Sequence, residues 1–146
     1  MNDSPPPIDN LPPVSDEALA RFDAVCPDAE AEVVELCLAA DAPETSMGPE
    51  AGATLKSGMR FVSQMLRASM RYSAGEIIAD ELEWGRARLP FHGVTAEMVL
   101  RNLARYQQAL ERRLPTEAFA AVRPYLEAMT RRQQAILKSI ESGSQR

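Results

Sequence analysis

Apolar residues recur at intervals of three and four along nearly the whole chain after residue 15, and this spacing constrains the fold more than any other feature. It is the period of an α-helix that buries one face. No segment alternates apolar and polar residues, as a half-buried strand would. Ala, Leu, Glu, Arg and Met, which favour helix, dominate the composition. The sequence therefore predicts an all-α fold.

Caps and prolines divide this pattern into six segments. Ser15 is a good N-cap for the first helix, and Pro27 is expected to end it and to begin the second. Ser73 and Glu76 fit a capping box at the start of the fourth helix. Pro124 is expected to kink the last helix or to split off its first turn. The predicted helices span residues 15–26, 27–40, 49–72, 75–89, 95–113 and 116–141.

A chain of 146 residues is the usual size of one domain. We expect residues 15–142 to form a single helical domain, preceded by a disordered, proline-rich lead over residues 1–14 and followed by a frayed tail over residues 143–146. The N-terminus lacks the pattern of a signal peptide, and no apolar run approaches the roughly 20 residues of a membrane span. These features predict a cytoplasmic protein without a membrane partner.

Charge is distributed unevenly along the chain. Residues 1–50 contain 12 acidic residues and one basic residue, whereas residues 51–146 contain 9 acidic and 15 basic residues. The acidic third can cover the basic remainder, within one chain or between chains, or the basic part can meet an anionic partner. Solvated surface charge is the simplest interpretation.

The residues that usually carry catalysis or bind metals are few. Cys26 and Cys37 form no CxxC pair, and each lies on an apolar helical face, which predicts buried thiols in a reducing compartment. Covalent attachment of a chromophore to one of them is the alternative. His92 is the only histidine, and no Cys/His cluster, HExxH motif or glycine-rich phosphate loop occurs. We predict no metal site and no enzymatic activity.

Large apolar side chains at helical spacing are typical either of a plain core or of the wall of a cavity. The cavity interpretation allows a fatty molecule or a flat tetrapyrrole as ligand. Gly52 and Gly58, within the long helix 49–72, are interpreted as marks of close helix crossings. The side chains predicted to line a pocket are Met59, Met65, Met70, Leu82, Trp84, Phe91 and Tyr106.

The segment FHGVTAEMVLRNLARY allows a DNA-binding alternative. A Gly-Val-Thr turn precedes helix 95–113, which carries Arg101 and Arg105, in the manner of a recognition helix. Pro90 occupies a place where a helix-turn-helix motif should still be helical. The apolar residues of helix 95–113 also cover a wide face, which suits a core better than a DNA groove. Nucleic acid is therefore disfavoured as a partner, and a small DNA-binding regulator is the third alternative.

The order of the predicted helices resembles a globin-like fold: a short pair, a long central helix, a shorter helix and a closing antiparallel pair. In globins, the helix before the closing pair carries the histidine that binds haem iron. Here that helix reads IIADELEWGRARL, with Leu82 and Trp84 in its middle and no histidine, and His92 lies beyond Pro90. The chain is thus similar, over roughly residues 15–142, to the non-haem sensor globins at the N-terminus of stressosome RsbR-family regulators.

The resemblance implies a sensory or regulatory module that has no cofactor. It would bind a small apolar ligand or a partner protein, and would signal by helix repacking to a partner that supplies the output. Phycobiliprotein-like relatives share the helical core, so a haem or bilin protein is the alternative, with His92 or Cys37 as the contact to the cofactor.

In such families the closing helix pair commonly forms a dimer interface. The apolar stripes on helices 95–113 and 116–141 allow the same arrangement here, because two such hairpins can pack as a four-helix bundle. We therefore expect a homodimer. Its predicted interface consists of Leu103, Leu110, Phe119, Val122, Leu126, Met129 and Ile136.

Overall fold

The computed structural model describes residues 11–144, and all regular secondary structure in this range is helical. The predicted all-α fold class is confirmed for the described residues, which include six α-helices and one 3₁₀ turn, η1. The elements are α1 (Asp16–Ala40), α2 (Glu44–Met47), α3 (Ala51–Tyr72), α4 (Gly75–Arg88), η1 (Leu89–His92), α5 (Ala96–Arg113) and α6 (Thr116–Ser144).

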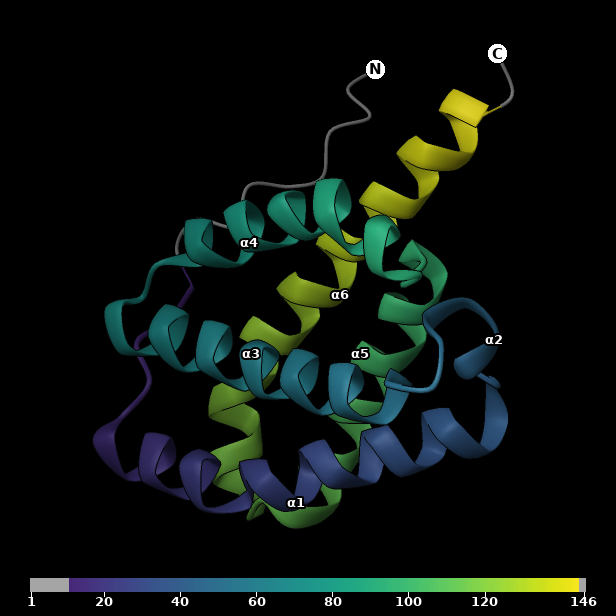
Figure 1. Cartoon of the computed structure of the whole chain (residues 1–146). Helices are drawn as coiled ribbons and strands as arrows, with labels where there is room; N and C mark the ends of the chain where they lie inside the picture. The colour runs from purple at the N-terminus through teal and green to yellow at the C-terminus, as the bar shows by residue number, and fades with distance from the viewer. Residues whose placement is uncertain (1–10, 145–146) are drawn as a thin grey trace.

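The long helices form two layers. In the view of Figure 1, α1, α3 and α4 lie one above another, while α5 and α6 run across behind them. Helix α1 packs on α3 and α5, and α4 packs on α3 and α6. The C-terminal end of α6 extends beyond α4 (Figure 1). The main apolar cluster takes side chains from α1, α3, α4, α5 and α6, so α3 lies between helices on more than one side.

Pro27 lies inside α1 and does not end it, so the predicted division of this segment into two helices is wrong. A proline inside a helix removes one backbone hydrogen bond and costs about 3 kcal/mol. Burying a large apolar side chain contributes about 1.5–3 kcal/mol, and a continuous α1 buries several on one face. The buried residues around the exposed proline are Phe22, Cys26, Ala29 and Val33.

The capping box predicted at the start of α4 is also wrong. Ser73 adopts a left-handed conformation, with φ of 49°, and ends α3. The N-cap of α4 is Ala74, which offers no side-chain cap. Its carbonyl instead accepts a hydrogen bond of 2.8 Å from the hydroxyl of Ser69. The sequence from Ser73 to Glu76 matches a capping box, but the turn between α3 and α4 is so short that Ser73 is the C-cap of α3.

The remaining boundaries differ less from the prediction. Pro124 lies inside α6, which is a single helix and is not split there. The expected loop 41–49 contains the short helix α2. Leu11 and Val14, from the lead expected to be disordered, pack against the core, and the hydroxyl of Tyr125 donates a 2.7 Å hydrogen bond to the carbonyl of Pro12. Residues 1–10 and 145–146 of the predicted lead and tail lie outside the described residues.

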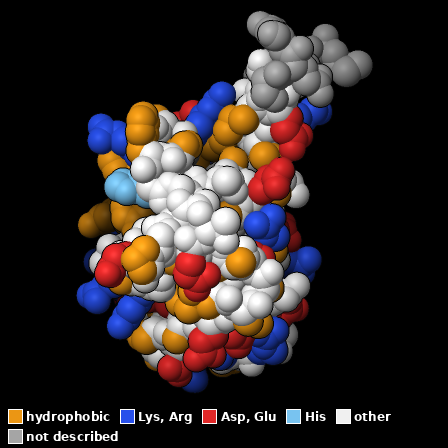
Figure 2. All heavy atoms as spheres, turned by 45° about the vertical axis from the view of Figure 1, so that its right-hand side comes forward, with side chains coloured by type: hydrophobic (Ala, Val, Ile, Leu, Met, Phe, Trp, Pro, Cys, Tyr) orange, Lys and Arg blue, Asp and Glu red, His pale blue; other side chains and the backbone are white. Residues whose placement is uncertain are grey.

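Ion pairs join the acidic N-terminal third to the basic remainder within the chain. Arg67 of α3 donates to both carboxylate oxygens of Asp23 at 2.9 and 3.0 Å. Arg112 and Arg113 of α5 both pair with Glu32. Figure 2 shows red and blue side chains intermixed over the lower part of the molecule. The uneven distribution of charge along the sequence therefore becomes local pairing in space, which contributes at most about 1 kcal/mol for each exposed pair.

The side chains predicted for a dimer interface lie in the core of the single chain. Phe119 is partly buried and packs against this core. A homodimer stays a prediction, but its contacts would have to come from other, exposed side chains, because the apolar stripes of α5 and α6 are covered by the chain itself. The predicted interface residues that are at most 2% exposed are Leu103, Leu110, Val122, Leu126, Met129 and Ile136.

None of the helices found among residues 11–144 combines the length and the apolar character needed to cross a membrane.

Alanine substitutions at two glycines with positive φ, Gly48 and Gly93, test how closely the α2 segment approaches the turn after η1. Gly93, with φ of 76°, packs so that an added Cβ would overlap the carbonyl of Ser46, whereas a Cβ on Gly48, with φ of 83°, would meet nothing within 4 Å. Left-handed strain costs an alanine about 1–2 kcal/mol at Gly93, whereas Gly48, with ψ of −172°, lies in a backbone region that is essentially restricted to glycine and costs an alanine about 1–3 kcal/mol. We expect Gly48→Ala to lower the free energy of unfolding by about 2 kcal/mol and Gly93→Ala, which adds the overlap with Ser46, by about 4 kcal/mol or more, measured by urea denaturation. Equal losses would contradict the close approach at Ser46.

Candidate ligand-binding site

An apolar cavity of about 170 Å³ lies between α3, α4, η1 and α5, and α6 also contributes to its wall. The pocket combines an apolar lining with a small number of polar groups, as small-molecule sites usually do. Its apolar wall includes Leu55, Met59, Phe61, Val62 and Met65 from α3, Leu82 and Trp84 from α4, and Leu89, Val94, Val99, Leu103 and Ile140 from the remaining elements.

Glycines on two helices help to keep this space open. Gly58 of α3 and Gly85 of α4 both line the pocket. A Cβ added to Gly58 would meet nothing within 4 Å, so the interpretation of this residue as a close helix crossing is wrong. A Cβ on Gly85 would lie 3.3 Å from a methyl group of Leu89. Gly58 is exposed and Gly85 is buried, so we expect larger side chains at Gly58 to narrow the opening of the pocket and those at Gly85 to press against Leu89.

Exposed apolar side chains surround the pocket on the outside of the bundle. Trp84 is 54% exposed, and Phe61 and Ile140 are also exposed although they line the cavity. The guanidinium carbon of Arg88 lies 5.0 Å from the centre of the Trp84 ring, within the range of a cation–π contact. Trp84 therefore forms part of the rim of the pocket rather than its interior.

Four of the seven side chains predicted for the pocket line it, namely Met59, Met65, Leu82 and Trp84. The other three lie elsewhere. Phe91 is 87% exposed and faces solvent, while Met70 and Tyr106 are buried in the main core. Helical spacing places residues on a face, but it does not distinguish the side of α3 that faces the cavity from the side that faces α1 and α5.

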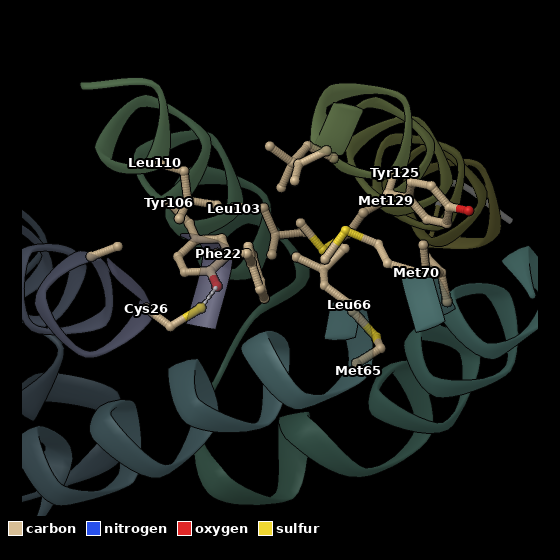
Figure 3. Close-up of a cluster of buried hydrophobic side chains, with 14 of the residues drawn as sticks. Phe22, Cys26, Met65, Leu66, Met70, Leu103, Tyr106, Leu110, Tyr125 and Met129 are labelled. Atoms are coloured by element: carbon tan, nitrogen blue, oxygen red, sulfur yellow. Dashed lines mark hydrogen bonds between the residues drawn. The ribbon is translucent and has the colours of Figure 1, made fainter. Parts of the chain in front are cut away.

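Tyr106 belongs to a chain of buried polar groups that joins α1, α3 and α5. Ser63 donates a 2.6 Å hydrogen bond to Glu30, and its oxygen lies 2.5 Å from the hydroxyl of Tyr106. Because Ser63 has one proton, Tyr106 donates to Ser63, and the thiol of Cys26, 3.6 Å away, donates to Tyr106. Figure 3 shows the hydroxyl of Tyr106 directed toward Cys26. Burial raises the pKa of the Tyr106 phenol well above its usual value, so it stays protonated.

A second hollow, of about 670 Å³, lies between α1 and α3, and Cys26, Glu30 and Ser63 of this polar chain line it. It is larger than the apolar pocket, but several of its polar residues are already paired with one another. Arg67 pairs with Asp23, and Ser63 with Glu30. A ligand there would compete with these bonds, so we assign the apolar pocket as the candidate site.

The structure places neither predicted cofactor contact in the pocket. His92 is exposed at the end of η1, and Cys37 is fully buried in a separate small cluster with Leu55, Val94 and Met98. Pockets for drug-sized ligands measure roughly 300–1,000 Å³, and a tetrapyrrole is at the large end of that range. A cavity of about 170 Å³ is too small to enclose one. No cluster of three potential metal ligands occurs in the described part of the chain.

Cys37 takes part in a polar network between the end of α1 and α5. Asn102 donates to the Cys37 sulfur, and the Cys37 thiol donates to Asp41, both at 3.6 Å. Burial raises the pKa of the Cys37 thiol, which disfavours the thiolate needed for covalent attachment of a chromophore. Arg105 binds both carboxylate oxygens of Asp41, at 2.8 and 3.1 Å, and these hydrogen bonds lower the pKa of Asp41 to about 2.

The same pairing bears on the DNA-binding alternative. Arg101 and Arg105 of α5 both contact Asp41, and the two arginines at the end of the helix pair with Glu32. Met98, Leu103 and other side chains of α5 are buried in the bundle. One face of α5 is thus covered by the bundle, and its arginines are paired with acidic side chains of the same chain. This arrangement does not favour α5 as a helix that enters a DNA groove.

Sequence reasoning did not identify Gln133 or Asn102 as pocket residues, although both line the cavity and are buried. Gln133 had one recognisable signal, because it is the polar interruption in the apolar stripe of the last helix. A polar side chain on a buried stripe normally has a hydrogen-bond partner, so such a residue is a candidate for a specific contact with another helix or with a ligand.

No protein-family model, curated protein or solved structure matches this chain. The function therefore has to be inferred from the chemistry of the site itself.

Asp41→Asn tests the network between α1 and α5. A carboxyl whose pKa is lower in the folded state, here about 2 against 3.8, stabilises the fold above pH 4 and loses this effect as the pH falls toward 2. We expect Asp41→Asn to lower the free energy of unfolding by about 2 kcal/mol at pH 7 and by progressively less between pH 4 and pH 2. Urea denaturation across this range measures the difference, with Asp28→Asn, at an exposed residue of α1, as the control. A loss that does not change with pH would contradict the assignment.

Proposed function

We propose that this protein is a non-enzymatic sensory or regulatory module that binds a small apolar molecule in the pocket between α3, α4 and α5. The observation that carries the proposal is the apolar cavity of about 170 Å³. An apolar protein cavity of roughly 150 Å³ is large enough to bind benzene. The expected ligand is therefore of about that size, such as a single ring or a short chain, and it is smaller than a tetrapyrrole.

Helix α4 is the element that a ligand would move most easily. It buries only Gly75, Ile78, Leu82 and Gly85, and two of these line the pocket. Arg86 of α4 donates a 3.2 Å hydrogen bond to Ser139 in the C-terminal part of α6. A ligand that separates α3 from α4, or draws them together, would change this contact, and a partner protein would detect the shift at the exposed rim or at the end of α6.

The resemblance to non-haem sensor globins supports the same kind of role. Its first part is weakened, because the continuous helix α1 replaces the expected short pair. The long α3, the shorter α4 and the pair formed by α5 and α6 keep the order on which the resemblance rests. Within this proposal, Trp84 lies where a globin would carry its iron ligand and instead forms part of the rim of a small apolar pocket.

Gly58→Leu tests the pocket directly. Leucine is favoured over glycine in a helix by about 0.8–1 kcal/mol, and a side chain at this position enters open space, so the variant should fold. Toluene is a suitable probe, and Trp84, the only tryptophan, reports its binding by fluorescence. We expect saturable binding of toluene to the unmodified protein, with a rise in Tm, and at least tenfold weaker binding to Gly58→Leu.

Gly143→Leu is the matched control, since this residue lies in α6, outside the pocket, and its added Cβ also meets nothing within 4 Å. It should bind toluene as the unmodified protein does. Absence of saturable binding to the unmodified protein, or equal binding by Gly58→Leu, would contradict the proposed function.

A further inference from the structure

Gln133 is the most deeply buried polar side chain in the wall of the pocket. It lies on α6, is only 4% exposed, and lines the cavity together with apolar side chains from α3 and α5. The amide nitrogen Nε2 donates a 3.2 Å hydrogen bond to the carbonyl of Ala96, in the first turn of α5. This bond holds the side chain where α6 crosses the beginning of α5.

The bond to Ala96 also fixes the direction of the amide. A carbonyl can only accept, so the NH₂ end of the Gln133 amide must face Ala96 and the oxygen Oε1 must be the other end. No residue among 11–144 donates a hydrogen bond to Oε1. Oε1 is not one of the fully buried side-chain atoms without a partner, so it keeps some accessible surface and a donor group can reach it.

The other buried amide of the pocket differs in this respect. Asn102 donates to the sulfur of Cys37 through Nδ2, and its Oδ1 accepts a 2.8 Å hydrogen bond from Arg105. Both ends of the Asn102 side chain are therefore engaged outside the cavity. Arg86 and Glu81 also line the pocket, but they lie on the outer helix α4, where Arg86 pairs with Glu83 and Ser139.

We infer that the ligand of this pocket is a small apolar molecule with a hydroxyl or N–H group that donates a hydrogen bond to Oε1 of Gln133. The inference rests on the proposed function and specifies its ligand class. The apolar wall would take up the hydrocarbon part of the molecule. This acceptor, on the most deeply buried polar side chain of the wall, would fix the orientation of the ligand. It would also distinguish a hydroxylated compound from a hydrocarbon of the same shape, because a hydrocarbon would leave Oε1 unpaired.

Phenol and toluene provide the test, since they have similar shape and differ in a hydroxyl against a methyl group. Gln133→Met removes the acceptor with little change in side-chain length. We expect Gln133→Met to weaken phenol binding at least tenfold and to change toluene binding by less than threefold, measured by calorimetry or by the rise in Tm. Dividing the change in phenol affinity by the change in toluene affinity separates the loss of the hydrogen bond from the general effect of the substitution on the pocket.

Gln134→Met, at the exposed neighbouring position on α6, is the matched control and should leave both affinities unchanged. Equal weakening of phenol and toluene by Gln133→Met, or no weakening of either, would overturn the assignment of Gln133 while leaving the apolar pocket in place. Failure of both compounds to bind the unmodified protein would overturn the proposed function and, with it, this inference.

Discussion

The hydroxyls of Tyr106 and Ser63 connect three helices inside an otherwise apolar core, and the arrangement of the bundle depends on this contact. Ser63 lies on α3, Tyr106 on α5, and Glu30 and Cys26 on α1, so one chain of hydrogen bonds fixes the relative positions of these helices. Each of these four side chains has a partner within the network, which is what makes the network compatible with a core. With this side of α3 committed to α1 and α5, Met59 and Met65 face the cavity beside α4.

The cavity itself is a cost to the fold that the apolar pattern of the sequence does not require. Side chains that lined a filled core would make van der Waals contacts across this space of about 170 Å³, and here they do not. Two glycines and a buried glutamine with a free acceptor in the same wall are easier to understand as parts of a ligand site than as a core that is incompletely packed.

The sequence predicted those parts of the fold that local rules control. Helical spacing, caps and prolines located α3, α4, α5 and α6 to within a few residues, although the capping box predicted for α4 does not form. The prediction failed at Pro27, where burial along a continuous α1 outweighs the loss of one backbone hydrogen bond. It also assigned the stripes of α5 and α6 to a second copy, although the other helices of the same chain cover them. Four pocket residues followed from helical spacing, whereas the roles of Gly58 and Gln133 depend on which helices face each other, and spacing along one helix does not contain that information.

The central claim is that a small apolar molecule enters the space between α3, α4 and α5, and the methionine methyl groups report this most directly. Met47, Met59 and Met65 line the pocket, whereas Met70 and Met129 do not, although Met59 and Met65 share the main core cluster with them. An NMR titration of methyl-labelled protein with toluene should shift the methyl signals of Met47, Met59 and Met65 in a saturable way and leave those of Met70 and Met129 nearly unchanged. Equal shifts at all five methionines, or shifts confined to Met70 and Met129, would contradict the account.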